Sequence, residues 1–323
     1  MLKKINWERQ IGRRMPLRDL YVFSTVVRLG SMGKAAQQLG VSQPAVSGVI
    51  ADLEHALGVR LLDRKRHGVE ATVYGAALER RSVAAFDELK QSIKDIEFLS
   101  DSSVGEVQIG CPESISVAIL HPIVEQFSRQ YPRVVLDVDT VNTLSFAQKL
   151  RDRELDVVLA RGGWPLEDPR LVMDFNVETL FDDELVIVAG RQSPWARRRK
   201  IDIAELHGER WMLTSGDRWN YQVVAKAFQQ RGLEIPTISV KTISVHLRAN
   251  MAATGRVITT LPRSVLVLYA DRFALQALPV NLPEPAWPVK IATLRNRTLS
   301  PAVERFIACA RTVGKSFTAS RRN

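Results

Sequence analysis

Two short helical patterns joined by a glycine constrain the fold of this 323-residue chain more than any other feature. Ser31 and Ser42 each stand where a serine caps the first turn of a helix, and Gly40 lies between the two patterns. Pro44 falls in the first turn of the second helix, where a proline is tolerated. Each pattern repeats its apolar residues at helical spacing. This arrangement predicts a helix-turn-helix.

Further patterns flank the helix-turn-helix on both sides. Residues 17–29 show helical periodicity and end at Gly30. Residues 59–72 are short, basic and interrupted by Gly68, as expected of a small β-hairpin. We therefore assign residues 16–75 to one N-terminal domain.

Positive charge is concentrated in the first quarter of the chain. Residues 1–81 hold 14 Lys/Arg and 7 Asp/Glu, a net charge of +7, whereas the whole chain carries +10. A polyanion is the expected partner of this quarter, and nucleic acid and an anionic membrane surface both fit. An unusually solvated surface is the alternative. The chain has no apolar run of about 18 residues, and its N-terminus lacks the apolar core of a secretory signal. We expect a cytoplasmic protein that does not span a membrane.

A long helical segment follows the basic domain. Between Gly75 and about Leu99 the sequence has no proline or glycine. Apolar residues recur there at 3-4-3 spacing, namely at Phe86, Leu89, Ile93 and Ile96. This seam predicts a helix of about 25 residues, roughly 37 Å long, that pairs with a second copy of the chain. We assign residues 76–103 to this linker, and an amphipathic helix packed on its own domain is the alternative.

The rest of the chain alternates strand and helix patterns. Glu106–Cys111, Val134–Thr140 and Leu155–Ala160 are β-rich, and helical stretches separate them. This order predicts parallel sheets in an α/β domain with two lobes and a cleft between them. We assign residues 104–176 and 279–315 to lobe one, 177–278 to lobe two, 1–15 to a basic extension and 316–323 to a tail.

One motif carries a family resemblance. Val41–Ser47, followed by Leu57–Leu62 and Arg64, closely resembles the LysR-type transcriptional regulators. The likeness continues nearly to Val313, although Gly48 stands where many members carry a basic residue. The resemblance implies an α/β chain with a helical, winged helix-turn-helix N-terminal domain. It also implies a long dimerising linker helix and a two-lobed effector domain similar to periplasmic binding proteins.

The resemblance also implies a function. It identifies a sequence-specific, DNA-binding transcriptional regulator that is controlled by a small molecule bound between the lobes. An enzyme of this fold with an appended DNA-binding domain is the alternative, since such folds also host catalysis. Expected partners are double-stranded promoter DNA, RNA polymerase, a small anionic or polyhydroxylated effector and further copies of the chain in a dimer or tetramer.

Neither a cofactor nor a metal ion is expected. The five histidines have no metal-ligand spacing, and the two cysteines form no Cys-x-x-Cys. Cys111 and Cys309 lie on apolar faces, which favours core packing over peroxide sensing.

The candidate DNA contacts follow from the second helix and the hairpin. Gln43 can pair bidentately with adenine, and Ser47 is short enough for a close backbone approach. The basic residues of the hairpin are expected on phosphates. Simple capping is the alternative for Ser42 and for Gln43, and a solvated charge run is the alternative for the hairpin. The complete predicted set is Ser42, Gln43, Pro44, Ser47, Gly48, Arg64, Lys65, Arg66 and Thr72.

The candidate effector contacts lie where the predicted strands of lobe one end. Ser114 and Thr143 follow the first two strands and Arg161 ends the third, so all three share the carboxyl edge of one sheet. Arg161 can clasp a carboxylate bidentately, with an inter-lobe salt bridge as the alternative. Capping is the alternative for the two hydroxyl residues. The complete predicted set is Ser114, Ser116, Asn142, Thr143, Arg161, Thr214 and Ser215.

Overall fold

The computed structural model describes residues 15–65, 68–101, 103–140, 145–162, 173–216, 218–283 and 287–319. The chain forms two compact units, Met1–Ile93 and Lys94–Asn323, and each is described by itself. The expected extension 1–15 lies outside the described residues except for Met15.

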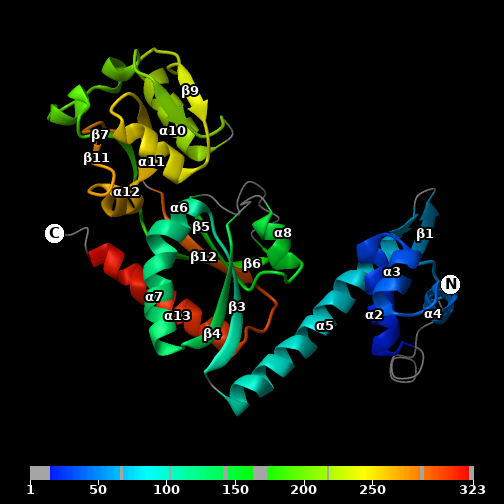
Figure 1. Cartoon of the computed structure of the whole chain (residues 1–323). Helices are drawn as coiled ribbons and strands as arrows, with labels where there is room; N and C mark the ends of the chain where they lie inside the picture. Colours follow the sequence, from blue (N-terminus) through cyan, green and yellow to red (C-terminus); the bar gives the residue numbers. More distant parts are fainter. Residues whose placement is uncertain are drawn as a thin grey trace. The chain divides into compact units, whose positions relative to one another are not determined.

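The first unit is a helix-turn-helix with a hairpin wing (Figure 1). Its elements are α2 (Leu17–Leu29), α3 (Met32–Leu39), α4 (Gln43–Leu57), β1 (Leu62–Lys65) and β2 (Gly68–Ala71). Ser31 caps α3 and Ser42 caps α4, as the sequence predicts. Gly30, Gly40 and Gly58 end the three helices in the left-handed conformation that glycine adopts at little cost.

A small apolar core holds this unit together. Phe23 of α2 and Leu53 of α4 are completely buried in it. The hairpin docks on the end of α2, where the Val69 N–H donates to the Gly30 carbonyl at 2.9 Å. A Cβ atom at position 68 would lie 2.3 Å from that carbonyl oxygen, so the close approach requires glycine.

The linker helix α5 (Val73–Ser100) has 28 residues, which corresponds to about 42 Å. It begins before residue 76, the boundary expected from the sequence, because Thr72 caps its first turn. The Thr72 hydroxyl accepts a hydrogen bond from the Gly75 N–H at 3.1 Å and donates to the Arg60 carbonyl at 2.7 Å. The helix α5 therefore begins directly after the last strand of the wing.

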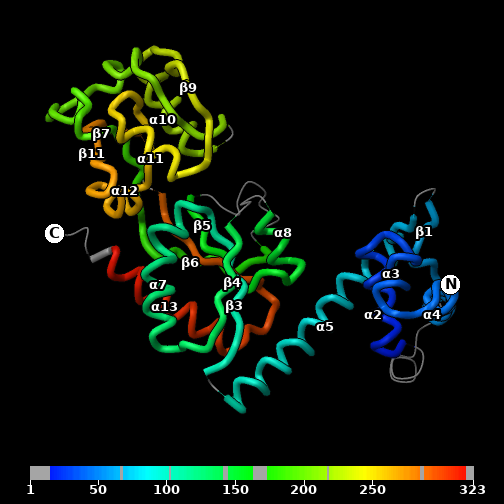
Figure 2. The backbone as a smooth tube through the Cα atoms, viewed as in Figure 1, coloured from blue at the N-terminus to red at the C-terminus, as the bar shows by residue number. Residues whose placement is uncertain are grey.

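Lobe one contains one mixed sheet in the order β4-β3-β5-β12-β6. β3, β4 and β5 are parallel, and β12 is antiparallel to β5 and β6. α7 and α13 pack together on one face, whereas α8 contributes to the core of the other (Figure 2). The elements are β3 (Val104–Gly110), α6 (Glu113–Ile115), η1 (Ser116–Leu120), α7 (His121–Gln130), β4 (Arg133–Asp139), α8 (Phe146–Arg151), β5 (Val157–Arg161), β6 (Phe175–Phe181), β12 (Val289–Leu294) and α13 (Pro301–Ala319).

Lobe two contains a second sheet in the order β11-β7-β10-β8-β9. β8 is parallel to β9 and β10, and β7 is antiparallel to β10 and β11. The elements are β7 (Leu185–Gly190), η2 (Pro194–Arg197), η3 (Ile203–Leu206), β8 (Trp211–Leu213), α10 (Trp219–Gln229), β9 (Ile238–Lys241), α11 (Val245–Ala253), β10 (Ile258–Pro262), α12 (Arg263–Tyr269) and β11 (Leu275–Ala277).

The lobe boundaries differ from those expected. β6 belongs wholly to the sheet of lobe one because it pairs with β12, so the first crossover follows Phe181 rather than residue 176. Residues 279–282 belong to lobe two, since the Pro279 carbonyl accepts from the Ile201 N–H and Val280 packs on that core. Residues 316–319 continue α13 instead of forming a tail, and the Phe317 ring stacks on Phe181.

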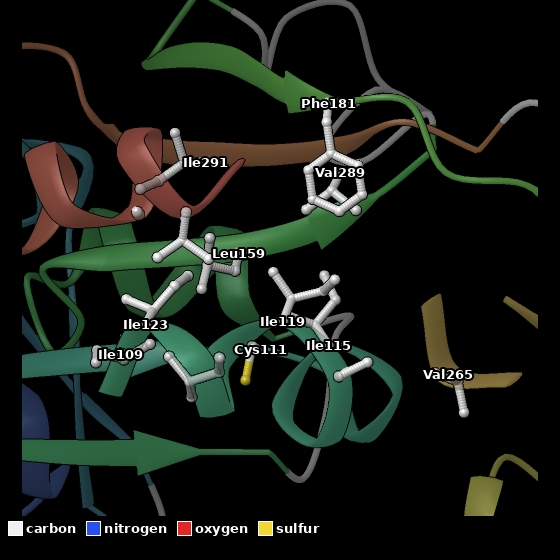
Figure 3. Packing of buried hydrophobic residues seen from close by; sticks show 14 of the residues in the cluster. Ile109, Cys111, Ile115, Ile119, Ile123, Leu159, Phe181, Val265, Val289 and Ile291 are labelled. Atoms are coloured by element: carbon white, nitrogen blue, oxygen red, sulfur yellow. The ribbon is translucent and has the colours of Figure 1, made fainter. Parts of the chain in front are cut away.

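One apolar cluster extends through both lobes. Ile115 and Ile119 pack in it together with Leu159 of β5 and Val265 of α12 (Figure 3). All four side chains are buried, and burying each contributes about 1.5–3 kcal/mol. The two lobes are therefore packed directly against each other. This contact region, the lobe junction, lies next to the predicted effector residues Ser114 and Ser116, which flank Ile115 in the chain.

Candidate DNA-binding and effector-binding sites

Helix α4 buries one face and exposes the other. Val46, Ile50 and Leu53 are buried, whereas Gln43 and Pro44 in the first turn are exposed. The exposed N-terminal turn of an amphipathic helix is the part that enters a major groove in helix-turn-helix proteins. α4 therefore has the geometry of a recognition helix.

The predicted DNA contacts of α4 differ in how exposed they are to solvent. The Ser42 hydroxyl accepts from the Ala45 N–H at 3.3 Å, which is the capping role stated as the alternative. Ser47 is half-buried and Gly48 is exposed. A Cβ atom at position 48 would meet nothing within 4 Å, so the position leaves the backbone open to a close partner.

The wing presents two basic side chains. Arg64 and Lys65 are both exposed on β1, and Arg66 lies outside the described residues. Lys65 forms an ion pair with Glu70 of β2 at 3.6 Å. Both members of this pair are exposed, so the pair contributes little stability. Since Glu70 lies beside Lys65, Arg64 is the stronger candidate for a phosphate contact.

Thr72, also a predicted DNA contact, forms hydrogen bonds with the backbone. Both hydrogen-bonding functions of its hydroxyl are used, by the Arg60 carbonyl and by the Gly75 N–H. A contact to DNA would have to come in addition to these bonds. Its observed role is to fix the start of α5 against the wing.

Glu54 couples the recognition helix to the wing and was missed as a functional residue. Its carboxylate accepts from the Leu61 N–H at 2.7 Å and from the Leu62 N–H at 3.2 Å. The sequence signal was its place in the last turn of α4, seven and eight residues before the two amides that it binds. This contact sets the spacing between α4 and β1.

The four seam residues of α5 fall into two groups. Phe86 is half-buried, and its ring meets Tyr21 of α2 edge-on at 5.7 Å. Leu89, Ile93 and Ile96 are 46%, 58% and 63% exposed. Phe86 thus packs within its own unit, while the other three leave an apolar stripe open.

At the lobe junction, the structure brings two of the predicted effector residues together. The Arg161 Nη2 atom donates to the Ser114 carbonyl at 3.3 Å. The Arg161 guanidinium also pairs with Asp183, and both side chains are almost completely buried. This is the inter-lobe salt bridge that the sequence left as the alternative to effector binding.

Asp183 is the centre of that network. Besides Arg161, its carboxylate accepts from the Ser264 hydroxyl at 2.6 Å, the Ser264 N–H at 3.2 Å and the Glu184 N–H at 2.8 Å. Burial lowers the pKa of Arg161, and the Asp183 charge opposes this shift. The arginine expected to clasp a ligand is therefore held by the chain's own carboxylate.

A second carboxylate links the lobes. Glu113 is the first residue of α6, and its carboxylate accepts from the N–H groups of Val245 at 2.9 Å and His246 at 3.3 Å. These amides open α11 of lobe two, where the helix dipole favours an anion.

Arg248 lies one turn further along α11 and is 4% exposed. Its Nη1 atom donates to the Thr260 carbonyl at 2.6 Å. Burial lowers the pKa of Arg248 to about 10, and the charge of Glu113 works in the opposite direction. The junction thus holds two buried arginines, and a carboxylate of the chain acts on each.

The remaining predicted effector residues are dispersed. Ser116 begins η1 and is half-buried, and Ser215 is exposed after β8. Thr214 is buried and donates to Asn220 Oδ1 at 2.6 Å. Asn142 and Thr143 lie outside the described residues.

Two tryptophans complete the junction. The rings of Trp219 and Trp287 stack at 4.9 Å, and the Arg161 guanidinium lies 5.4 Å from the centre of the Trp287 ring. A Cβ atom at position 162 would lie 2.6 Å from Trp287 Nε1, so this approach requires Gly162. No local pattern indicated this stack, because its members are far apart in the chain.

Sequence reasoning also missed Glu113, Asp183, Ser264 and Arg248. Only Arg248 carried a local signal, since it interrupts the apolar face formed by Val245, Ala249 and Ala252. The others act through contacts that span tens of residues or more, which no local pattern encodes.

A separate pocket of about 430 Å³ lies in lobe one. Its charged lining residues are Asp137, Asp139, Glu154 and Lys149. Lys149 already pairs with Asp139. Because the carboxylates outnumber the single ammonium group, this pocket does not suit an anion.

The two cysteines are buried and form no disulfide. Burial raises the pKa of the Cys111 thiol to about 12 and also raises the pKa of Cys309. Since the thiolate is the reactive form, both sites disfavour oxidation. Their surroundings are those of core residues.

Metal-binding clusters and membrane-spanning helices are both absent from the part of the chain that the structure describes. No three His, Cys, Asp or Glu side chains come together there in a way that could hold a metal ion. None of the helices in that part combines the length and apolar character needed to cross a membrane.

Comparison with known proteins bears on both units. The family described as "Bacterial regulatory helix-turn-helix protein, lysR family" matches residues 17–76, and the "LysR substrate binding domain" matches residues 100–315. The transcriptional regulator TdcA of Escherichia coli (strain K12) is 32% identical over 243 residues, which cover 75% of this chain and 76% of TdcA. The regulator GbpR of Azospirillum brasilense is 26% identical over 95% of this chain and 88% of its own.

Solved structures share the fold. A full-length, singly substituted OxyR from Pseudomonas aeruginosa matches with a TM-score of 0.63 and 23% identity, over 93% of this chain and 95% of its own. Full-length CbnR in complex with its target DNA matches with a TM-score of 0.53 and 19% identity, over 93% and 100%. Together with the matched domains, these likenesses show that the chain belongs to the LysR family of DNA-binding transcriptional regulators, with an N-terminal helix-turn-helix and a C-terminal effector domain.

Proposed function

We propose that this regulator binds promoter DNA by placing the exposed N-terminal turns of α4 in the major groove. Gln43 reads an adenine edge, and the backbone at Ser47 and Gly48 approaches the bases closely. Arg64 on the wing contacts phosphate, and Lys65 and Arg66 support it. The observation that carries this proposal is the capped, amphipathic α4, whose apolar side is buried and whose first turn is exposed.

The active form in this proposal is a dimer formed through α5. Leu89, Ile93 and Ile96 provide an exposed apolar stripe, which a second copy of the helix would cover. A two-fold dimer places its two recognition helices on major-groove faces roughly 34 Å apart. Contact with RNA polymerase then follows from binding next to a promoter.

Control comes from a small molecule at the lobe junction, which we assign to binding and not to catalysis. The relatives are regulators, and the predicted hydroxyl residues can bind a ligand but supply no general base. Ser114, Ser116, Thr214 and Ser215 are the proposed contacts among the described residues, and Asn142 and Thr143 are proposed from the sequence. Arg161 acts here as a positioning residue through Asp183.

Footprinting of the full chain on the DNA flanking its own gene tests this proposal. We expect two protected half-sites one helical turn apart and a footprint that changes with a member of a small-metabolite panel. Protection without sequence preference, or a footprint that no metabolite changes, would contradict the respective part of the proposal.

A further inference from the structure

The first two amides of α11 already hold a carboxylate. Glu113 accepts from both of them, at 2.9 and 3.3 Å, although it belongs to the other lobe. The next amide of this turn, that of Leu247, is bound by the capping Ser244 hydroxyl at 3.3 Å. The start of α11 is thus a formed anion site that a side chain of the same chain fills.

A buried cation beside this site has unused hydrogen-bonding capacity. Arg248 follows Val245 by three residues, so both lie on one face of α11. Its Nε–H has no hydrogen-bond acceptor among the described residues, and neither has the hydroxyl of Thr260, whose carbonyl binds Arg248. A buried donor left unpaired costs free energy, so an anion that reached it would bind favourably.

The two carboxylates of the junction are held unequally. Asp183 is buried and accepts four hydrogen bonds from Arg161, Ser264 and Glu184. Glu113 is half-buried and accepts two, both from backbone amides. Glu113 is therefore the carboxylate that an incoming anion can replace.

We propose that the N-terminus of α11, together with Arg248, is a carboxylate subsite of the effector site, and that Glu113 is an internal competitor for it. This inference rests on the proposed function, because it assigns part of the effector to that junction. A metabolite carboxylate takes over the amides of Val245 and His246 and displaces the Glu113 side chain. The displacement removes a direct link between the lobes, which couples binding to lobe movement.

Acetate rescue tests this subsite in the full chain. Glu113→Ala empties the place of one carboxylate, and free acetate is the smallest molecule that can refill it. We expect acetate, compared with chloride at equal ionic strength and pH 7.5, to raise the Tm of Glu113→Ala by about 3 °C with saturation. Glu125→Ala is the matched control, since it removes an exposed carboxylate of the same lobe that pairs with Arg129.

Two results would overturn the proposed subsite, one for each variant of Glu113. Equal acetate responses of Glu113→Ala, Glu125→Ala and the unaltered chain would overturn the subsite. If Glu113→Ala does not fold, Glu113→Gln provides the test through hydrogen exchange. Exchange at Val245 and His246 should be faster in that variant and should be slowed again by acetate at those amides alone, and exchange unchanged by acetate would also overturn the subsite.

Neither readout involves DNA or an identified effector. Rescue by acetate together with a footprint that no metabolite changes would therefore refute effector control in the proposed function and leave the carboxylate subsite standing. A metabolite-dependent footprint without rescue would refute the subsite alone.

Discussion

The DNA-binding unit and the lobe junction use arginine in opposite ways. Arg64 on the wing is exposed to solvent, whereas Arg161 and Arg248 at the junction are buried and have carboxylates of the same chain acting on them. An exposed cation can reach a phosphate without any rearrangement of the protein, and each such contact releases counterions from the DNA. A buried cation with an internal counter-ion responds only when that counter-ion is exchanged. The DNA-binding unit can therefore bind its partner as it stands, whereas in our proposal an effector first displaces a carboxylate at the lobe junction.

The largest expected effect comes from breaking the buried pair of the junction. Asp183→Ala leaves the Arg161 guanidinium buried without its counter-ion and should lower the free energy of unfolding by about 3–5 kcal/mol. Denaturant unfolding of the full chain measures this loss. Asp182→Ala is the control, because Asp182 is the exposed neighbour. Equal stabilities of the two variants would show that the pair is not structurally important.

The apolar stripe of α5 should give the next largest effect. Leu89→Glu together with Ile93→Glu places two charges in the proposed dimer seam and should dissociate the dimer. Sedimentation velocity measures the association state. Lys90→Glu changes the net charge by the same amount at an exposed position outside the stripe and should leave the dimer intact. A double variant that sediments like the unaltered chain would refute the seam.

Base reading at α4 should be a smaller effect. Gln43→Ala should reduce the preference for the specific site over other DNA by about 1–3 kcal/mol, since one bidentate contact is lost. Competition binding with specific and unrelated duplexes measures the ratio. Gln37→Ala, at an exposed glutamine of α3, should keep it. A Gln43 variant with full preference would show that the residue caps or packs without reading a base.

The smallest effect concerns the exposed arginine itself. Arg64→Ala should weaken specific and unrelated DNA alike and lower the slope of log affinity against log salt by about 1. Affinities at several salt concentrations give the slope. Arg198→Ala, an exposed arginine of lobe two that pairs with Glu205, should not change it. Identical slopes for the Arg64 variant and the unaltered chain would remove the phosphate contact.

The sequence predicted the DNA-binding unit better than the lobe junction, and locality is the reason. Ser31, Ser42 and the glycines that end the helices act within one helical turn of their own position, so their roles follow from spacing. Residues 177–181 of β6 were assigned to the wrong lobe because the partner strand β12 lies more than 100 residues further along the chain. The same holds for Glu113, whose amide partners are 132 and 133 residues away.

For Arg161 the sequence predicted the place in the fold but did not identify its partner Asp183. Its place at the carboxyl edge of the lobe-one sheet followed from the order of the strands, and the structure places it beside Ser114 as expected. Its role depends on Asp183, which reaches it from the start of lobe two. Strand order gives the edge of a sheet, but only the fold shows which charge meets which.

The most direct test of the contrast between the two regions is the DNA footprint of Glu113→Gln. The neutral side chain weakens the inter-lobe link without touching the DNA-binding unit. We predict that this variant binds the same site with unchanged affinity but shows, without any metabolite, the footprint that a carboxylate metabolite induces in the unaltered chain. Glu125→Gln should behave like the unaltered chain. A Glu113→Gln footprint that matches the unaltered chain with and without metabolite would contradict the account.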